Sequence, residues 1–324
     1  MDFLSAKLRI VSVLVGIAIA GIAVGIIALT VKLVWGFSLS VISVYFIIGV
    51  IVVIDVMQWL FSPYVISRMY RLKEINSTDM EYSWLVQLVN NVSQTNKQKM
   101  PKVFIAEVNE PNAFAFGSPI AGRRMAVTRG ALNILNRDEL AAVIGHEMGH
   151  LRHGDVELLM AIGLIPTLIF YFGFMLLFSG NNRNNGGYIF LIAILLVAVS
   201  FVFNLMILAV NRMREAYADI NAAKTVDGGA ENLQTALAKI VSSYGVQKSY
   251  NRFSRRQRNS SSSSSAGSSF SNMLMFSSTK DAEYGDYRSL LDEWKRMKPS
   301  LISTIFSDHP HPAKRIQLLE RYKS

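Results

Sequence analysis

Residues Asn136 to Gly154 read NRDELAAVIGHEMGHLRHG, and this stretch predicts a helix that carries chemical groups. Asn136 followed three residues later by Glu139 has the form of a capping box, a side-chain pattern that starts many helices. The apolar helix expected after it is LAAVIGHEMGHLRH, and Gly154 is the residue type that commonly closes a helix.

The middle of this helix contains a metal-binding pattern. His146 and His150 are four residues apart and therefore share one face, so both imidazoles can reach a single metal ion. Glu147 lies about 100° further round the helix, near such an ion without pointing at it. A general base that acts on water beside the metal requires this position.

The rest of the composition indicates a membrane protein. The chain has 324 residues, of which 51% are hydrophobic and 17% charged, and its mean hydropathy is +0.29. Soluble domains are about 25% charged, which argues against an ordinary soluble globule. Four uncharged apolar stretches reach the length of about 20 residues that a membrane span needs. They are Ile10–Val31, Leu33–Ile54, Leu158–Phe178 and Tyr188–Val210.

Basic residues near these stretches predict the orientation. Lys and Arg precede the first and third stretches and follow the second and fourth, whereas the two connecting turns hold only Lys32 and Arg183. By the positive-inside rule we expect a multi-pass protein of the plasma membrane with both termini and the active site cytoplasmic. The net charge of +10 suits membrane lipids as partners, and no nucleic-acid-binding pattern accompanies it.

The sequence predicts an α+β fold, with four transmembrane helices and a zincin-like catalytic domain in two parts. A helix is expected over 80–96 and short strands over 102–107, 112–116 and 124–128, separated by proline and glycine turns. An Arg- and Ser-rich insertion over 251–272 is expected to be disordered. The predicted domain ranges are 1–55 for the first hairpin, 56–157 for the first catalytic part, 158–210 for the second hairpin, and 211–324 for the second catalytic part.

A zinc site needs a third protein ligand. The chain has no cysteine, which excludes thiolate ligands, disulfides and cysteine nucleophiles. The candidates are a carboxylate or one of the remaining histidines, His153, His309 and His311. His153 lies about 10 Å further along the helix axis than His146, so we expect it to face solvent. Glu215 is better placed, because EAYAD over Glu215–Asp219 is expected to begin a helix just after the fourth span, where the second apolar hairpin returns to the surface it left.

Together these motifs resemble the HtpX-type membrane zinc metalloproteases, relatives of the Ste24 and Oma-type proteases. The resemblance rests on HEMGH, on EAYAD as the family's ExxxD, and on the spanning hairpin between them. Asn112–Gly117 (NAFAFG) matches the family's substrate-side edge strand. Asp308–Pro312 (DHPHP), followed by Arg315 and Ile316, resembles its C-terminal motif, with Asp308 in place of Thr and His311 in place of Pro.

The resemblance implies a role for each of these residues. One zinc ion per chain would be held by His146, His150 and Glu215, and Asp219 would accept a hydrogen bond from a ligand imidazole. Glu147 would take a proton from the attacking water. The expected oxyanion groups are His309 and Arg315, with His311 as the alternative to His309. The other readings are a surface His-Pro turn for His309 and a salt bridge at the start of a helix for Arg315. The edge strand expected to bind substrate comprises Asn112, Ala113, Phe114 and Ala115; its alternative reading is a half-buried strand with alternating phenylalanines.

The implied activity is that of a zinc metalloendopeptidase in protein quality control, which cleaves damaged or misassembled membrane proteins at the cytoplasmic face. One alternative is a Ste24-like maturation protease with a dedicated substrate, although the larger chamber of that family needs more than four spans. The other is a non-catalytic membrane scaffold stabilised by zinc. The presence of Glu147 favours an enzyme, because a purely structural zinc site has no use for a carboxylate at that position.

Overall fold

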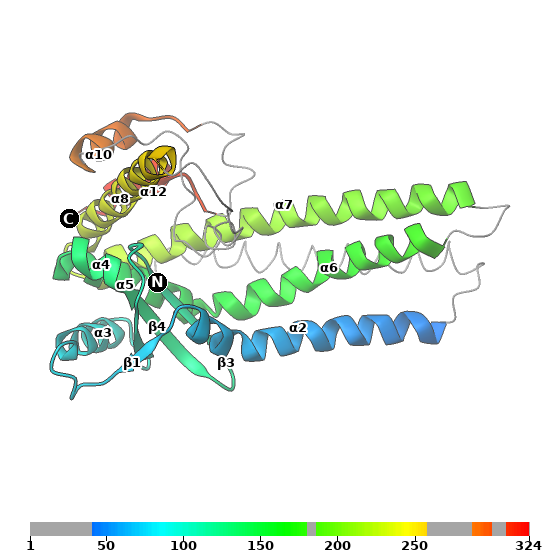
Figure 1. Cartoon of the computed structure of the whole chain (residues 1–324), viewed down its shortest axis with the longest axis horizontal. Coiled ribbons are helices and arrows are strands. Elements are labelled where there is room, and N and C mark those ends of the chain that lie inside the picture. The colour runs from blue at the N-terminus through cyan, green and yellow to red at the C-terminus, as the bar shows by residue number, and fades with distance from the viewer. Residues whose placement is uncertain (1–40, 180–185, 258–286, 300–308, 324) are drawn as a thin grey trace. The chain divides into compact units, whose positions relative to one another are not determined.

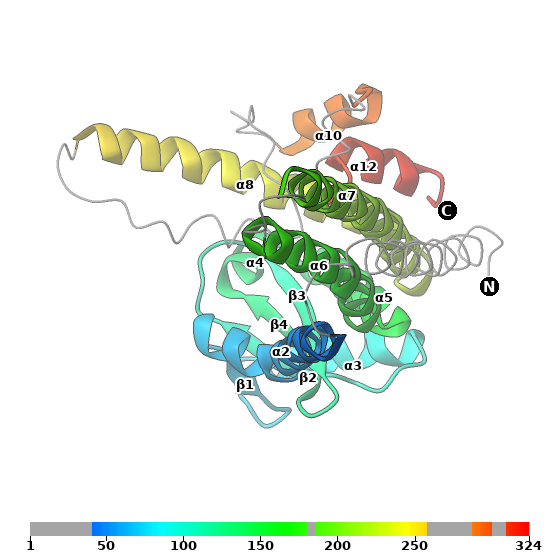
Figure 2. The ribbon, with the colours of Figure 1, turned by 90° about the vertical axis from the view of Figure 1, so that its right-hand side faces the viewer.

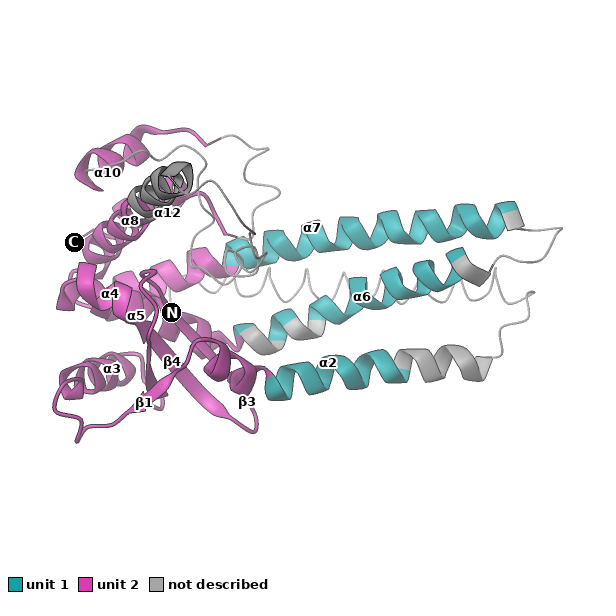
Figure 3. Cartoon of the chain, viewed as in Figure 1, with its two compact units in different colours: residues 1–61, 155–213 teal, residues 62–154, 214–324 magenta. Residues whose placement is uncertain are grey.

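The computed structural model describes residues 41–179, 186–257, 287–299 and 309–323. The chain divides into two compact units, coloured separately in Figure 3. Unit 1 comprises Met1–Phe61 and Asp155–Met213, and unit 2 comprises Ser62–Gly154 and Arg214–Ser324. The expected span over 10–31 and most of the Ser-rich insertion, from 258 to 272, lie outside the described residues.

Unit 1 contains helical segments that are long and apolar. Its elements are the first part of α2 (Val41–Met69), α6 (Asp155–Ser179) and the first part of α7 (Gly186–Thr225) (Figure 1). Within the described residues, two helices are long and apolar enough to cross a membrane, Gly49–Met69 and Gly187–Thr225, and Ile162–Leu177 is a shorter apolar helix. Four spans therefore remain a prediction.

In unit 1, α6 and α7 pack side by side. Gly173 makes the close approach possible, because a Cβ added there would lie only 2.9 Å from Leu196 Cβ. Large apolar side chains such as Phe174 and Leu195 remain exposed on the outer surfaces of these helices. The side chains buried between them are Ile169, Leu176, Ile189, Ala193, Leu196 and Phe203.

Two expected boundaries prove wrong. The EAYAD segment does not begin a new helix, because α7 is one uninterrupted helix of 40 residues from Gly186 to Thr225. No glycine or proline lies between Val210 and Glu215 to end it. Likewise α8 (Gly229–Gln257) extends into the insertion that was expected to be disordered from residue 251, because arginine and glutamine support a helix up to the start of the serine run.

Unit 2 is built on a four-stranded sheet. Its strands are β1 (Lys73–Ile75), β2 (Lys102–Ala106), β3 (Ala113–Ser118) and β4 (Gly122–Thr128). Their order is β1-β2-β4-β3, with β2 and β4 parallel and the other neighbours antiparallel. The three expected strands are confirmed, and the last two of them pair as a hairpin, whereas β1 was missed. With three residues, two of them charged, it carries no apolar alternation.

The two faces of the sheet are covered by different helices. Because side chains alternate along a strand, Val103 and Ile105 of β2 face one core, and Phe104 and Ala106 face another. The first core contains α3 (Ser83–Thr95) and α5 (Arg137–His153); the second contains Tyr70, just after α2. The expected helix over 80–96 is thus confirmed as α3.

The remaining helices of unit 2 complete the first core. α8 packs against α5, and α10 (Tyr287–Arg296) and α12 (Pro312–Glu320) pack against α8 and against each other (Figure 2). A short helix, α4 (Arg129–Ile134), links β4 to α5. The mixed sheet and helices confirm the expected α+β architecture of this unit.

Candidate metal centre

The helix α5 forms as its sequence predicts. The Asn136 side chain accepts a hydrogen bond from the Glu139 backbone N–H at 2.8 Å, and the Glu139 carboxylate accepts one from the Asn136 N–H at 2.9 Å. This reciprocal pair is the expected capping box. At the other end, Gly154 adopts the left-handed conformation, with φ 61°, that allows the chain to leave the helix.

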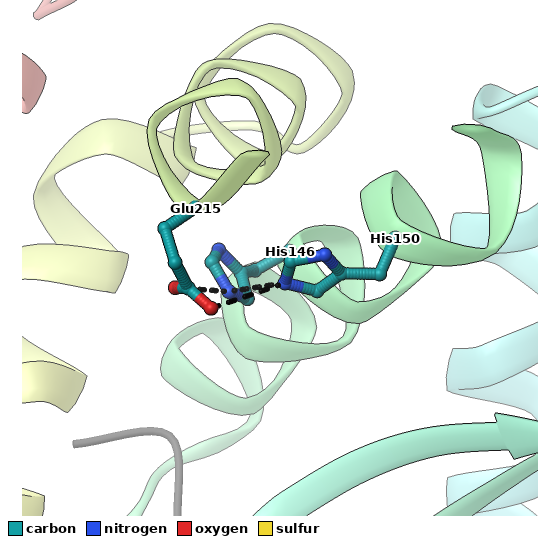
Figure 4. Close-up of side chains that lie close together, drawn as sticks. All are labelled: His146, His150 and Glu215. Atoms are coloured by element: carbon teal, nitrogen blue, oxygen red, sulfur yellow. Dashed lines mark hydrogen bonds and ion pairs between the residues drawn. The ribbon is translucent and has the colours of Figure 1, made fainter. Parts of the chain in front are cut away.

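α5 and α7 bring three potential metal ligands together, as Figure 4 shows. The Nε2 atoms of His146 and His150 lie 3.2 Å apart, and the Glu215 carboxylate oxygens lie 3.5 Å and 3.6 Å from them. A tetrahedral zinc ion bound at about 2.0–2.1 Å separates its ligand atoms by roughly 3.3–3.5 Å. The donor set and its spacing therefore fit a metal ion.

Asp219 orients the imidazole of His146. One of its carboxylate oxygens lies 2.9 Å from His146 Nδ1, and both side chains are fully buried. A carboxylate at Nδ1 fixes the proton on that nitrogen and leaves Nε2 with a lone pair toward Glu215 and His150. This contact is the one expected of Asp219.

Arg315 connects two of the acidic side chains. Its Nε donates to Asp219 Oδ2 at 2.9 Å, and its Nη1 lies 3.3 Å from Glu215 Oε2. Burial by itself would lower the pKa of Arg315, but the charges of Asp219 and Glu215 outweigh it and raise that pKa. A permanently charged guanidinium thus compensates two carboxylates in the interior.

Glu147 is held by the edge strand β3. Its Oε2 accepts a hydrogen bond from the Ala115 backbone N–H at 2.8 Å. Burial raises the pKa of Glu147, against the opposing effect of the two neighbouring histidines, His150 and His146, and of the Ala115 amide. A raised pKa is the condition in which a carboxylate accepts and returns a proton near neutral pH.

Among the described strands, β3 pairs with β4 alone and lies at an edge of the sheet. Asn112, just before it, has both its N–H and its carbonyl engaged by Thr128. The Ala115 N–H points the other way, toward Glu147. Phe114 is buried in the second core. Of the four residues expected to bind substrate, Ala115 thus directs a backbone group toward the centre.

The histidines near the C-terminus are placed differently from each other. His309 Nδ1 lies 2.9 Å from Glu215 Oε1, at the metal centre. His311 is the N-cap of α12, where its Nδ1 accepts a hydrogen bond from the Ala313 N–H at 3.1 Å. Burial lowers the pKa of His311, and the positive charge of Lys314 lowers it further.

His153 lies outside the metal cluster, as expected, but it does not simply face solvent. It is half-buried, and its ring meets the ring of Tyr217 edge-on, with centroids 3.8 Å apart. The helix α7 passes beside the last turn of α5, and its Tyr217 partly covers the His153 side chain.

A network that the sequence did not reveal fixes α5 against α7. Asn221 donates to the Gly145 carbonyl at 2.8 Å and to the side chain of Asn96, the residue that caps the end of α3, at 2.7 Å. Gly145, just before the HEMGH motif, and Gly149, within it, face α7, where a Cβ on Gly149 would lie 2.9 Å from Ala218 Cα. Buried Asn side chains carry no periodic signal, so sequence inspection could not find this contact.

Replacing Gly149 by alanine is expected to weaken zinc binding by about 10–100-fold, the loss typical of residues that support metal ligands. The added methyl group would push α7 and its Glu215 away from α5. The matched control is Gly163→Ala in α6, where a Cβ meets nothing within 4 Å. Competition with a chelator measures the zinc affinity of both variants; unchanged affinity in Gly149→Ala would show that helix spacing does not set the site.

Comparison with known proteins places the chain among peptidases. Residues 79–323 match the model of Peptidase family M48. A "Protease HtpX homolog" of Thermoplasma acidophilum is 54% identical over the whole chain and 99% of the relative. One of Picrophilus torridus is 51% identical, again over the whole chain and 99% of the relative. The crystal structure of S. mikatae Ste24p has the same fold, with a TM-score of 0.56 at 16% identity, covering 97% of this chain and 67% of that one.

Proposed function

Because the chain belongs to peptidase family M48, a family of metallopeptidases, we propose that it is a membrane-embedded zinc endopeptidase. The observation that carries the proposal is the set of His146, His150 and Glu215 with donor atoms within 4.8 Å of one another, beside a buried Glu147. Three protein ligands leave a fourth position for water, the arrangement of catalytic rather than structural zinc sites.

Zinc, when bound, would supply Lewis-acid chemistry that polarises a peptide carbonyl and lowers the pKa of water. The protein's own groups perform the proton transfers. Glu147 takes a proton from the attacking water and passes it to the departing amine. The Ala115 N–H holds one carboxylate oxygen of Glu147, and the other oxygen would take the proton. Asp219 keeps His146 in the tautomer that binds metal through Nε2.

The substrate would bind as an added strand along β3. An edge strand offers backbone donors and acceptors to an extended peptide. Because these hydrogen bonds involve only the peptide's backbone, most of its side chains are tolerated. The Ala115 backbone contacts Glu147, so a peptide paired with β3 would lie next to this carboxylate. Such recognition suits an enzyme that cleaves many unfolded segments rather than one defined sequence.

We place this activity at the cytoplasmic face of the cell membrane and assign damaged or misassembled membrane proteins as substrates. The candidate spans and the distribution of lysine and arginine around them support this location. The edge strand supports the choice of substrate, since misassembled membrane proteins expose extended segments.

The test uses the purified full-length protein in detergent or lipid. Metal analysis should find one zinc per chain, and the protein should cleave an unfolded membrane protein but leave its folded form intact. Removal of the metal with a chelator should stop cleavage, and added zinc should restore it. Cleavage that persists without metal would contradict the proposal.

Replacing His309 by alanine should lower kcat by about 10²–10³, the usual loss of an oxyanion donor, while zinc stays bound. We assign this role to His309 rather than Arg315, because the Arg315 side chain is buried between Asp219 and Glu215, whereas the His309 side chain is 19% exposed at the metal centre.

His311→Ala is the matched control: it removes the cap of α12 and should cost about 0.5–2 kcal/mol of stability with little change in turnover. Measurement of kcat and zinc content for both variants separates the possibilities. A large loss confined to His311→Ala would reverse the assignment, and zinc loss in His309→Ala would make it a ligand.

A further inference from the structure

The turn that joins β3 to β4 exposes an apolar side chain at its tip. Ile120 is 54% exposed, and Pro119 beside it is also exposed. Gly122 closes the turn with φ 71°, a conformation that favours glycine. A single exposed isoleucine is ordinary on a protein surface, so its meaning depends on its neighbours.

Arg124 fastens this turn to the last turns of α2 within unit 2. Its Nη1 donates to Ser67 Oγ at 3.1 Å, and its Nε donates to the Ala121 carbonyl at 3.3 Å. Its guanidinium also lies 5.0 Å from the ring centroid of Tyr64. The turn and the end of α2 therefore form one surface, here named the tip surface, which consists of Tyr64, Val65, Met69, Pro119 and Ile120.

The part of the tip surface on α2 continues a longer apolar stripe. Exposed large hydrophobic residues recur along the helix at intervals of three and four, which places them on one face. The whole stripe lies within the candidate span Gly49–Met69, and its last three residues belong to the tip surface. Its residues are Val50, Val53, Ile54, Met57, Phe61, Tyr64, Val65 and Met69.

The two chain segments that form the tip surface carry charges of one sign. Residues 62–72 and 117–124 contain four arginines, Arg68, Arg71, Arg123 and Arg124, and no acidic residue. Tyrosine and arginine at the end of an apolar stripe are typical of the boundary between lipid tails and headgroups. Arginine in that layer is attracted to anionic lipids.

We propose that the tip surface lies in the headgroup layer of an acidic phospholipid bilayer. β3 then leads from the lipid surface to the metal centre, because only about 10 Å of strand separates Ser118 from Ala115, which contacts Glu147. A segment that leaves the bilayer beside Ile120 can pair with β3 and reach Glu147 directly. This consequence rests on the proposed peptidase function, whereas the lipid contact does not.

Because the chain has no cysteine, one introduced cysteine gives a unique labelling position. Ile120→Cys and the control Met80→Cys, at a residue 99% exposed in unit 2, are labelled with the fluorophore NBD. Both are reconstituted in vesicles of equal parts phosphatidylcholine and phosphatidylglycerol. Headgroup-level spin-labelled lipid should quench the label at position 120 several-fold more than at position 80. Equal quenching, or a blue-shifted label at 120 that lipid does not quench, would overturn the proposal.

A second measurement tests the path along β3. Ile120→Asp should reduce cleavage of a membrane-anchored substrate at least several-fold and leave cleavage of a soluble peptide unchanged. Equal effects on both substrates would overturn the delivery path. If the unaltered protein cleaves neither substrate, the peptidase function fails, while the quenching result still decides the lipid contact.

Discussion

Replacing Glu215 by alanine is expected to abolish zinc binding and peptidase activity together. Loss of a residue that only supports a metal ligand already weakens binding by about 10–100-fold, and removal of one of three ligands should cost more. The effect should be large because Asp219, the other carboxylate that contacts these imidazoles among the described residues, is committed to His146 Nδ1 and Arg315. Zinc content after dialysis and hydrolysis of an unfolded substrate measure the two losses.

The matched control is Glu231→Ala on α8. Its side chain is 73% exposed and forms a surface contact with Lys323 at 3.7 Å, worth little in water. The control should keep zinc and activity. Stoichiometric zinc in Glu215→Ala would transfer the ligand role to His309, whose Nδ1 lies 2.9 Å from the Glu215 carboxylate.

The local parts of this centre could be predicted from the sequence because they depend on residues close together in the chain. The capping box, the glycine end of α5 and the shared face of His146 and His150 follow from helix periodicity alone. The approach of Glu215 could also be expected, since an apolar hairpin must return to the surface it left. For these features the sequence expectation and the structure agree.

Other features depend on contacts between segments far apart in the chain and left no sequence signal. The bond from Ala115 to Glu147 involves a backbone N–H, so any residue other than proline could supply it. The contact of Asn221 with Gly145 depends on how closely two helices pack. The length of α7 was missed because its polar continuation is as compatible with a helix as its apolar part is.

Arg315 shows the limit of inference from a motif. Its position near the C-terminus suggested an oxyanion donor, and the structure places its guanidinium on Asp219 and Glu215. Two carboxylates that are buried close together repel each other, and an always-charged arginine offsets that cost. Only the folded arrangement shows that the site contains this excess of negative charge.

Replacing Glu147 by glutamine should leave zinc bound and lower kcat by about 10²–10⁴, the range for loss of a general base. Glutamine has nearly the same shape, and its amide oxygen can still accept the hydrogen bond from the Ala115 N–H, so the fold should be retained. Only the capacity to take a proton disappears. Parallel measurement of zinc content, thermal stability and kcat distinguishes this outcome from general damage.

Glu139→Gln on the same helix is the control, and it should lower stability but leave turnover unchanged. Glu139 is buried and pairs with Lys239 at 2.7 Å, so its neutralisation should cost roughly 1–3 kcal/mol of stability. Glutamine can keep the capping box, and turnover per folded molecule should not change. If Glu147→Gln instead loses zinc or stability while Glu139→Gln does not, Glu147 is a structural group. The proton must then be taken elsewhere, because a carboxylate that only maintains the fold does not act as the base.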